Sequence, residues 1–404
     1  MRRTGHGPPS DARWDHIMPR RFLFPLAALL AVGVWACSGQ SAREQGPTTR
    51  QSVELRDRDS STSFAALIER LSEPAGYFDT DNLISNERSY LHVMGKLAQL
   101  GVRGGAYVGV GPDQNFSYIA QVRPEIAFII DIRRDNLLQH LLFKALFALS
   151  QNRIEFLCLW LGRPLPDNPT SWHDQPIRAV VAQVDGPPAG ARRIAATDEA
   201  VWNEVKSFGL RLSAGDSATI SRFHRAFVEA GLNLRFSSFS RPPLPDYPTL
   251  RQLLLEQDLS GHLTNYLASE TSFQFVKSLE DKDLVVPVVG DLGGEHALAA
   301  IGSLLADRGL RVSAFYTSNV EFYLMRQGRF QRYGERVSRL PRDDRSVIIR
   351  SYFNRGFGGV HPQSTHGYSS TQLMQTVSSF VDEYSSGGYP TYWDLVTKHA
   401  IDLR

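Results

Sequence analysis

Short apolar runs alternate along the chain with longer stretches in which apolar residues recur every three or four positions. The short runs predict β-strands, and the periodic stretches predict amphipathic helices. The expected strands are 106–108, 126–130, 232–236, 284–289, 311–316 and 346–352. The expected helices are 63–71, 86–100, 113–122, 136–149, 153–161, 199–208, 217–231, 250–279 (broken near residue 260), 295–308 and 371–384. A stretch rich in proline, aspartate and glycine, 162–196, predicts a long connection or a lid. This alternation favours an α/β fold with a mostly parallel sheet and helices on both faces.

The segment between the first two expected strands carries the most information about function. The apolar run 106–108 leads into Gly109-Val-Gly111, a helical stretch follows, and the next apolar run ends at Asp131. This is the layout of a nucleotide-binding βαβ unit. The glycines allow a tight turn and a close approach of a ligand to the backbone, and the helix start offers free N–H groups. Asp131 follows Gly111 by 20 residues and can accept hydrogen bonds from ribose hydroxyls.

Residues 97–135 resemble the first motifs of class I S-adenosylmethionine (SAM)-dependent methyltransferases, in which an apolar strand runs into Gly-x-Gly-x-Gly and an acid closes the second strand. The resemblance implies a Rossmann-like domain that binds SAM and acts on a small molecule. Gly109 and Gly111 would lie under the methionine part of SAM, and Asp131 would hold its ribose. The resemblance thus implies Gly109, Gly111 and Asp131 as cofactor-binding residues, and we add Asp113 and Asn115 to this predicted set because they follow the same strand end.

A second part of the resemblance lies further along the chain. Residues 284–291 resemble the fourth strand of that family, and Asp291 matches the acidic or amide residue beside the transferable methyl group, which implies a catalytic role. Two positions differ from the family pattern: Asp113 replaces the third glycine, and Tyr107 replaces an acid two residues before the first glycine. The chain is also similar to bacterial proteins of unknown activity that carry the string 107–116.

Ligands of such sheets bind outside the carboxyl ends of the strands. Polar or glycine residues follow several expected strands, and we expect them to gather there: Pro112, Gln114, Arg133, Gly293, Gly294, Glu295, His296, Ser318, Asn319 and Glu321. Asp113, Asp131, Asn319 and Glu321 are equally compatible with capping helix starts. The loop 77–82 precedes the first strand. Its aromatic residues would either stack on a flat ligand or pack the loop onto the body.

The amino terminus predicts export. Two arginines at positions 20 and 21 precede a short apolar run, 22–34, that ends before Cys37. These are the parts of a secretory signal, and the run is too short to span a bilayer. Cys37 then resembles the lipidated residue of a bacterial lipobox. We expect a signal in residues 1–36, with Met18 a possible start, a flexible tether in 37–62, and an α/β domain in 63–404 with a helical insertion at about 140–280. An ordinary apolar helix is the alternative.

Composition excludes several other functions. The net charge is +2, and residues 1–36 hold five arginines and two aspartates, so the rest of the chain is nearly neutral. A basic surface for nucleic acid is therefore not expected. Two cysteines, Cys37 and Cys158, give no disulfide framework. No Gly-x-Ser-x-Gly and no His-Glu-x-x-His is present, so neither a serine hydrolase nor a metal site is predicted.

Two functions stay open from the sequence. The first is methyl transfer from SAM to a small molecule, which fits a cytoplasmic protein. The second is an exported protein, lipid-anchored in the cell envelope, that uses the same kind of fold to bind another ligand without methyl transfer. They exclude each other because SAM is a cytoplasmic metabolite. The sequence does not predict the oligomeric state.

Overall fold

The computed structural model describes residues 63–240, 244–354 and 359–404, which all belong to one compact unit, residues 58–404. The predicted signal (1–36), the tether (37–62) and Cys37 lie outside the described residues.

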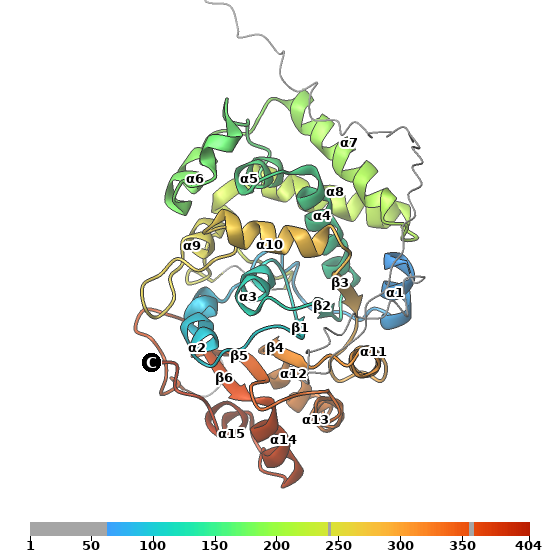
Figure 1. The fold of residues 1–404 in the computed structure, drawn as a ribbon, viewed down its shortest axis with the longest axis vertical. Helices are drawn as coiled ribbons and strands as arrows, with labels where there is room; N and C mark the ends of the chain where they lie inside the picture. The colour runs from blue at the N-terminus through green and yellow to red at the C-terminus, as the bar shows by residue number, and fades with distance from the viewer. Residues whose placement is uncertain (1–62, 241–243, 355–358) are drawn as a thin grey trace, which may run out of the picture. The chain divides into compact units, whose positions relative to one another are not determined.

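Six strands form one sheet in the described part of the chain (Figure 1). They are β1 (Ala106–Gly109), β2 (Ile126–Asp131), β3 (Val285–Val289), β4 (Val312–Ser318), β5 (Val347–Phe353) and β6 (Ser370–Thr376). Their order is β3-β2-β1-β4-β5-β6, with β6 antiparallel to β5 and all other neighbours parallel. The prediction of an α/β fold with a mostly parallel sheet is thus confirmed. The carboxyl ends of the first five strands share one edge, and the chain changes direction across the sheet between β1 and β4.

Eighteen helical elements surround this sheet in the described residues. The α-helices are α1 (Phe64–Leu71), α2 (Met94–Gln99), α3 (Gln114–Val122), α4 (Arg134–Leu149), α5 (Arg153–Trp160), α6 (Ile177–Gln183), α7 (Ala191–Ser207), α8 (Ala214–Ala230), α9 (Leu250–Leu254), α10 (Glu270–Glu280), α11 (Ala297–Asp307), α12 (Val320–Arg326), α13 (Phe330–Ser338), α14 (Val377–Ser385) and α15 (Tyr392–Thr397). The 3₁₀ helices are η1 (Arg88–Val93), η2 (Pro169–Trp172) and η3 (Gly231–Asn233).

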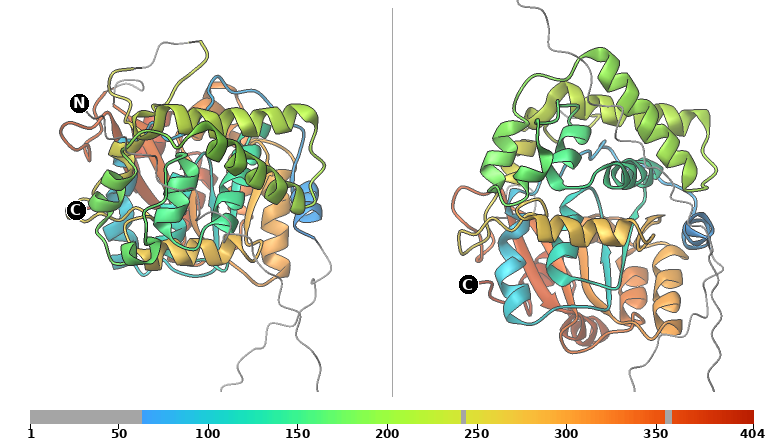
Figure 2. Two further views of the ribbon diagram at one scale, coloured as in Figure 1. Left: turned by 90° about the horizontal axis from the view of Figure 1, so that it is seen from above. Right: turned by 45° about the horizontal axis from the view of Figure 1, so that its top comes forward.

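The helices cover both faces of the sheet. Helices α3 and α4 contact β1, β2 and β3 on one face, and α12 and α14 contact β4 and β6 on the other (Figure 1). Helices α7 and α8 pack on α4 and form a further layer outside it (Figure 2). All strand positions except the last residues of β2, β4, β5 and β6 are buried, which explains why the central strands read as continuous apolar runs.

Several sequence predictions about elements were wrong. Residues 371–384 read as one helix, but the first half is β6, because pairing with β5 overrides the local helical period. The expected strand 232–236 contains η3 and only an isolated bridge between Arg235 and Thr249. The expected connection 162–196 contains η2, α6 and the start of α7. Helices α12, α13 and α15 were not predicted.

A buried ion pair links strand β5 to helix α12. Arg350 on β5 donates to the Glu321 carboxylate on α12 at 2.6 Å, and neither side chain is exposed by more than 2%. Tyr333 on α13 also donates to Glu321, at 2.8 Å. Glu321 is therefore a buried first-turn acid that fixes α12 on the sheet, which agrees with the helix-start alternative of the sequence analysis.

Candidate functional site

The glycine turn after β1 is filled by the chain's own side chains. A Cβ on Gly109 would overlap the Asn115 side-chain oxygen and lie 2.6 Å from the Tyr107 hydroxyl. Tyr107 donates to Asn115 Oδ1 at 2.7 Å, and Asn115 Nδ2 donates to the carbonyls of Val110 (2.9 Å) and Pro112 (2.7 Å). Asn115 is completely buried. Gly109 thus leaves space for the Asn115 and Tyr107 side chains, and the hydrogen bonds of Asn115 stabilise the turn.

Gly111 adopts a left-handed conformation, with φ of 85°, which is compatible with the tight turn expected there. Its open side faces Gln114 Nε2 and Asn82 Nδ2, which would lie 3.3 Å and 3.4 Å from a Cβ. Its carbonyl accepts a hydrogen bond from the buried His140 ring at 2.9 Å. Burial lowers the pKa of His140 to about 4, so the ring is neutral and donates through Nε2.

A segment that precedes β1 lies beside this turn, where Asn82 approaches Gly111. We call residues 79–85 the strap. The Leu83 carbonyl accepts a hydrogen bond from Gln139 on α4 at 2.6 Å, and the side chains of Leu83 and Ile84 are buried. Phe78, just before the strap, packs edge to face on Tyr323 of α12, with ring centroids 5.0 Å apart. The adjacent Tyr77 is 76% exposed. Of the two aromatic residues in this loop, Phe78 packs onto the body of the protein and Tyr77 is exposed.

Asp131 lies at the end of β2, as predicted, but both its oxygens already hold Arg133. Oδ1 accepts from the Arg133 backbone N–H (2.9 Å) and from Nε (3.0 Å), and Oδ2 accepts from Nη2 (2.7 Å). Arg133 Nη1 donates to the carbonyls of Thr80 (3.1 Å) and Asp81 (2.8 Å). Asp131 therefore orients an arginine that fastens the strap.

Asp113 is buried beside the turn, 5% exposed, and makes no side-chain capping bond to α3. Burial raises the pKa of Asp113 to about 7. The carboxylate of a SAM molecule on this turn would lie near the Asp113 side chain. Because Asp113 is buried, its carboxyl group favours the neutral form.

These observations test whether SAM fits the residues present. The Gly109 cradle is occupied by Asn115 and Tyr107, and the ribose-binding oxygens of Asp131 are bonded to Arg133. The strap also brings Asn82 next to Gly111, with Asn82 Nδ2 3.4 Å from the position of a Cβ. In this arrangement, the five predicted cofactor-binding residues do not fit SAM.

Asp291 belongs to a different part of the molecule. The strand before it is β3, which pairs only with β2 at the sheet edge, so its identification as the fourth strand is wrong. The strand beside β1 on the other side is β4, which ends at Ser318. The Asp291 carboxylate accepts from Arg329 and from the Gly293 N–H (2.8 Å), and the Asp291 N–H donates to Glu73 at 2.7 Å. These bonds shape a loop.

The neighbours of Asp291 share this structural role. The Glu73 carboxylate accepts from the backbone N–H groups of His296 (3.1 Å) and Ala297 (3.3 Å) at the start of α11, and the His296 ring bonds the Arg70 carbonyl at 2.8 Å. A Cβ on Gly294 would overlap the Glu73 side chain. The predicted set Gly293, Gly294, Glu295 and His296 therefore surrounds α1 and α11, and no bond brings it to the glycine turn in the described residues.

A buried carboxylate that sequence reasoning missed lies at the carboxyl ends of the central strands. Glu87 is 2% exposed and accepts hydrogen bonds from Ser318 and Tyr316 of β4 and from Ser351 of β5. Burial raises the pKa of Glu87, while the three hydroxyl donors favour its ionised form. Tyr316 also accepts from Gln114 at 3.3 Å, so the predicted residues Gln114 and Ser318 belong to one network.

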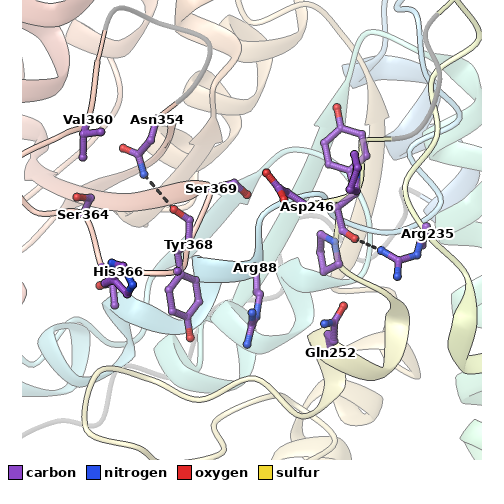
Figure 3. A pocket seen from close by; sticks show the side chains of 15 residues that line it. Arg88, Arg235, Asp246, Gln252, Asn354, Val360, Ser364, His366, Tyr368 and Ser369 are labelled. Carbon is purple, nitrogen blue, oxygen red and sulfur yellow. Dashed lines mark hydrogen bonds between the residues drawn. The ribbon is translucent and has the colours of Figure 1, made fainter.

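An open cleft of about 710 Å³ adjoins the end of β5 (Figure 3). One wall consists of Asn354 and residues 360–369, which follow β5, and the other consists of residues 245–252, which lead into α9. The lining residues are Arg88, Arg235, Pro245, Asp246, Tyr247, Pro248, Gln252, Asn354, Val360, Ser364, Thr365, His366, Gly367, Tyr368 and Ser369. None of them belongs to the predicted site. The segments are far apart in sequence and lack a regular pattern, so only the fold could bring them together.

The described residues contain no candidate metal cluster and no candidate membrane-spanning helix. No group of three or more histidine, cysteine, aspartate or glutamate side chains there has the arrangement of a metal site. None of the helices in the described ranges combines the length and apolar composition that a bilayer crossing requires.

Comparison with known proteins gives one match. No curated protein matches the chain. A family described as Domain of unknown function (DUF7790) matches residues 83–164 and 247–398, which together make up more than half of the sequence. The matched parts contain all six strands, Glu87 and Arg88, and the stretch between them, 165–246, contains η2, α6, α7, α8 and η3. The chain therefore belongs to the family described as Domain of unknown function (DUF7790).

Proposed function

We propose that this chain is an exported, lipid-anchored protein that uses a Rossmann-like fold to bind a small polar ligand, without methyl transfer from SAM. The observation that carries the proposal is the contrast between two places at the same sheet edge. The cradle at Gly109 is filled by Asn115 and Tyr107, whereas the cleft beside β5 is open and lined mostly by polar side chains.

The sheet order supports a Rossmann-like origin for the fold. The order β3-β2-β1-β4-β5-β6 is that of doubly wound nucleotide-binding sheets, and antiparallel edge strands such as β6 occur in that class. Ligands of such sheets bind outside the carboxyl ends of the strands, and the cleft adjoins the end of β5. Fold alone does not specify chemistry, so the ligand follows from the residues of the cleft.

Calorimetric titration of the full chain with SAM tests the loss of methyl transfer. We expect no heat beyond dilution at millimolar SAM, because a ligand would have to displace Arg133 from Asp131 and open the strap. Heat that saturates at micromolar SAM and disappears in Asp131→Ala at the end of β2, but not in Asp79→Ala on the strap, would restore the methyltransferase hypothesis and refute this proposal.

Metabolic labelling with palmitate tests the anchor. We expect wild-type protein to carry the label and to fractionate with membranes, because Cys37 follows the apolar run. Cys37→Ser should lose the label, and Cys158→Ser should keep it, since Cys158 is only 2% exposed within α5. An unlabelled wild-type protein in the soluble cytoplasmic fraction would contradict export.

A further inference from the structure

The cleft beside β5 contains an arginine whose orientation is fixed by its neighbours. Arg88 Nε donates to the Glu256 carboxylate at 2.7 Å, and the guanidinium lies over the Tyr368 ring, 4.9 Å from its centroid. The Tyr368 hydroxyl donates to the other Glu256 oxygen at 2.7 Å, and Glu256 is only 5% exposed. One edge and one face of the guanidinium are thus held in place by a buried acid and an aromatic ring.

The remaining edge of Arg88 faces the cleft. Its side chain is 40% exposed, and Nη1 and Nη2 have no hydrogen-bond partner among the described residues. Figure 3 shows Arg88 between Tyr368 and the wall that carries Gln252. An arginine edge that is free and already oriented suits the two oxygens of a carboxylate or phosphate, and little side-chain entropy is lost on binding.

The opposite wall adds a second guanidinium. Arg235 is exposed and donates through Nη1 to the Tyr247 carbonyl, which holds it at the cleft (Figure 3). The cleft lining holds two arginines and one acid, Asp246, and the Glu256 carboxylate that pairs with Arg88 lies behind the lining. Side-chain hydroxyl and amide groups complete the lining: Gln252, Asn354, Ser364, Thr365 and Ser369. Such groups pair with ligand hydroxyls.

From this arrangement we propose that the cleft binds a small hydroxyl-bearing molecule with a carboxylate or phosphate group, and that Arg88 receives this group. The inference rests on the proposed function and specifies its ligand class. Arg88 is a binding residue, Glu256 and Tyr368 position it, and Arg235 supplies further positive charge. Because Glu256 compensates the delocalised charge of Arg88, the ligand anion is held by hydrogen bonds from Nη1 and Nη2 of Arg88 and by the positive charge of Arg235.

Titration of the full chain with three sugars tests the ligand class. Glucose 6-phosphate carries a phosphate, glucuronate carries a carboxylate, and glucose carries neither. We expect at least one of the two anionic sugars to bind with a Kd below about 1 mM and glucose to bind at least tenfold more weakly. The stronger of the two anions identifies the group. Equal binding of all three sugars, or no binding of either anion, would overturn the proposal.

Variants of the two arginines test its geometry. Arg88→Lys keeps a charge beside Glu256 but removes the fork, and we expect at least tenfold weaker binding. Arg235→Gln leaves the Glu256 pair intact and should weaken binding three- to tenfold, so it remains informative if Arg88 variants unfold. Arg332→Gln is a matched control, because Arg332 is 46% exposed and pairs with an acid away from the cleft. Unchanged affinity in folded Arg88→Lys and Arg235→Gln would refute the assignment, whereas SAM binding would refute only the proposed function.

Discussion

At the scale of single residues, the glycine motif has a structural explanation. Gly109 is required because Asn115 and Tyr107 occupy the volume that a side chain would fill, and Gly111 because its φ is positive. The same two positions would be glycine in a cofactor-binding turn, since both uses need a backbone without a Cβ. A glycine motif therefore indicates that another group lies close to the backbone. The rest of the fold decides whether that group is a ligand or a side chain of the protein.

Gly109→Ala separates the two interpretations. The new methyl group would overlap Asn115 Oδ1, which cannot move without losing its bond from Tyr107, so we expect a loss of about 2–3 kcal/mol in the free energy of unfolding. Urea unfolding measures it. Gly186→Ala is the control, because no atom lies within 4 Å of its Cβ and the expected change is below about 0.5 kcal/mol. A Gly109→Ala protein of wild-type stability would favour an open cradle.

The buried carboxyl of Asp113 predicts a pH dependence of stability. Burial raises the pKa of Asp113 from 3.8 to about 7, so the folded state binds a proton that the unfolded state has released between these values. This stabilisation is fully present below pH 3.8 and is lost as the pH rises through about 7. Relative to Asp113→Asn, the wild type should lose on the order of 2–4 kcal/mol between pH 4 and pH 8. The free energy of unfolding is measured with urea at each pH. If it changes equally with pH in both proteins, Asp113 is not buried as a neutral carboxyl group.

At the scale of elements, the strap and the β2–α4 junction form one unit. Arg133 sits between the Asp131 carboxylate and two strap carbonyls, and its side chain is 7% exposed. Because breaking these bonds would leave the buried Arg133 and Asp131 charges without partners, the strap is held against the β2–α4 junction. The motif residue Asp131 acts here through Arg133.

Arg133→Ala should release the strap. Two hydrogen bonds to its carbonyls disappear and the Asp131 charge loses its partner, so we expect amide hydrogen exchange of residues 80–84 to become at least tenfold faster. Arg134→Ala is the control, because the adjacent Arg134 pairs instead with Asp216 on α8 and does not touch the strap. Exchange in the strap that is equally slow in both variants would show that Arg133 does not fasten it.

At the scale of the whole molecule, the sheet order decides which residues can meet. β3 lies at the edge beyond β2, so Asp291 cannot take the place beside β1 that a fourth strand would give it. β4 takes that place and brings Ser318 to Glu87. The cleft likewise brings Arg88 together with residues that follow β5 and residues that precede α9. Most of these residues lie in the regions that match the family.

The sequence by itself determined the alternation of strands and helices, the βαβ unit from 106 to 131 and the tight turn at Gly109 and Gly111, because these depend on local periodicity and on the backbone freedom of glycine. It could not determine the register partner of residues 370–376, which are compatible with a helix until β5 pairs with them. It also could not predict that Arg133 would form an ion pair with Asp131, or that Glu87 would be buried, since both depend on which distant segments pack at the strand ends. The tertiary structure decided the candidate site, because a cleft is made by segments whose proximity no local pattern encodes.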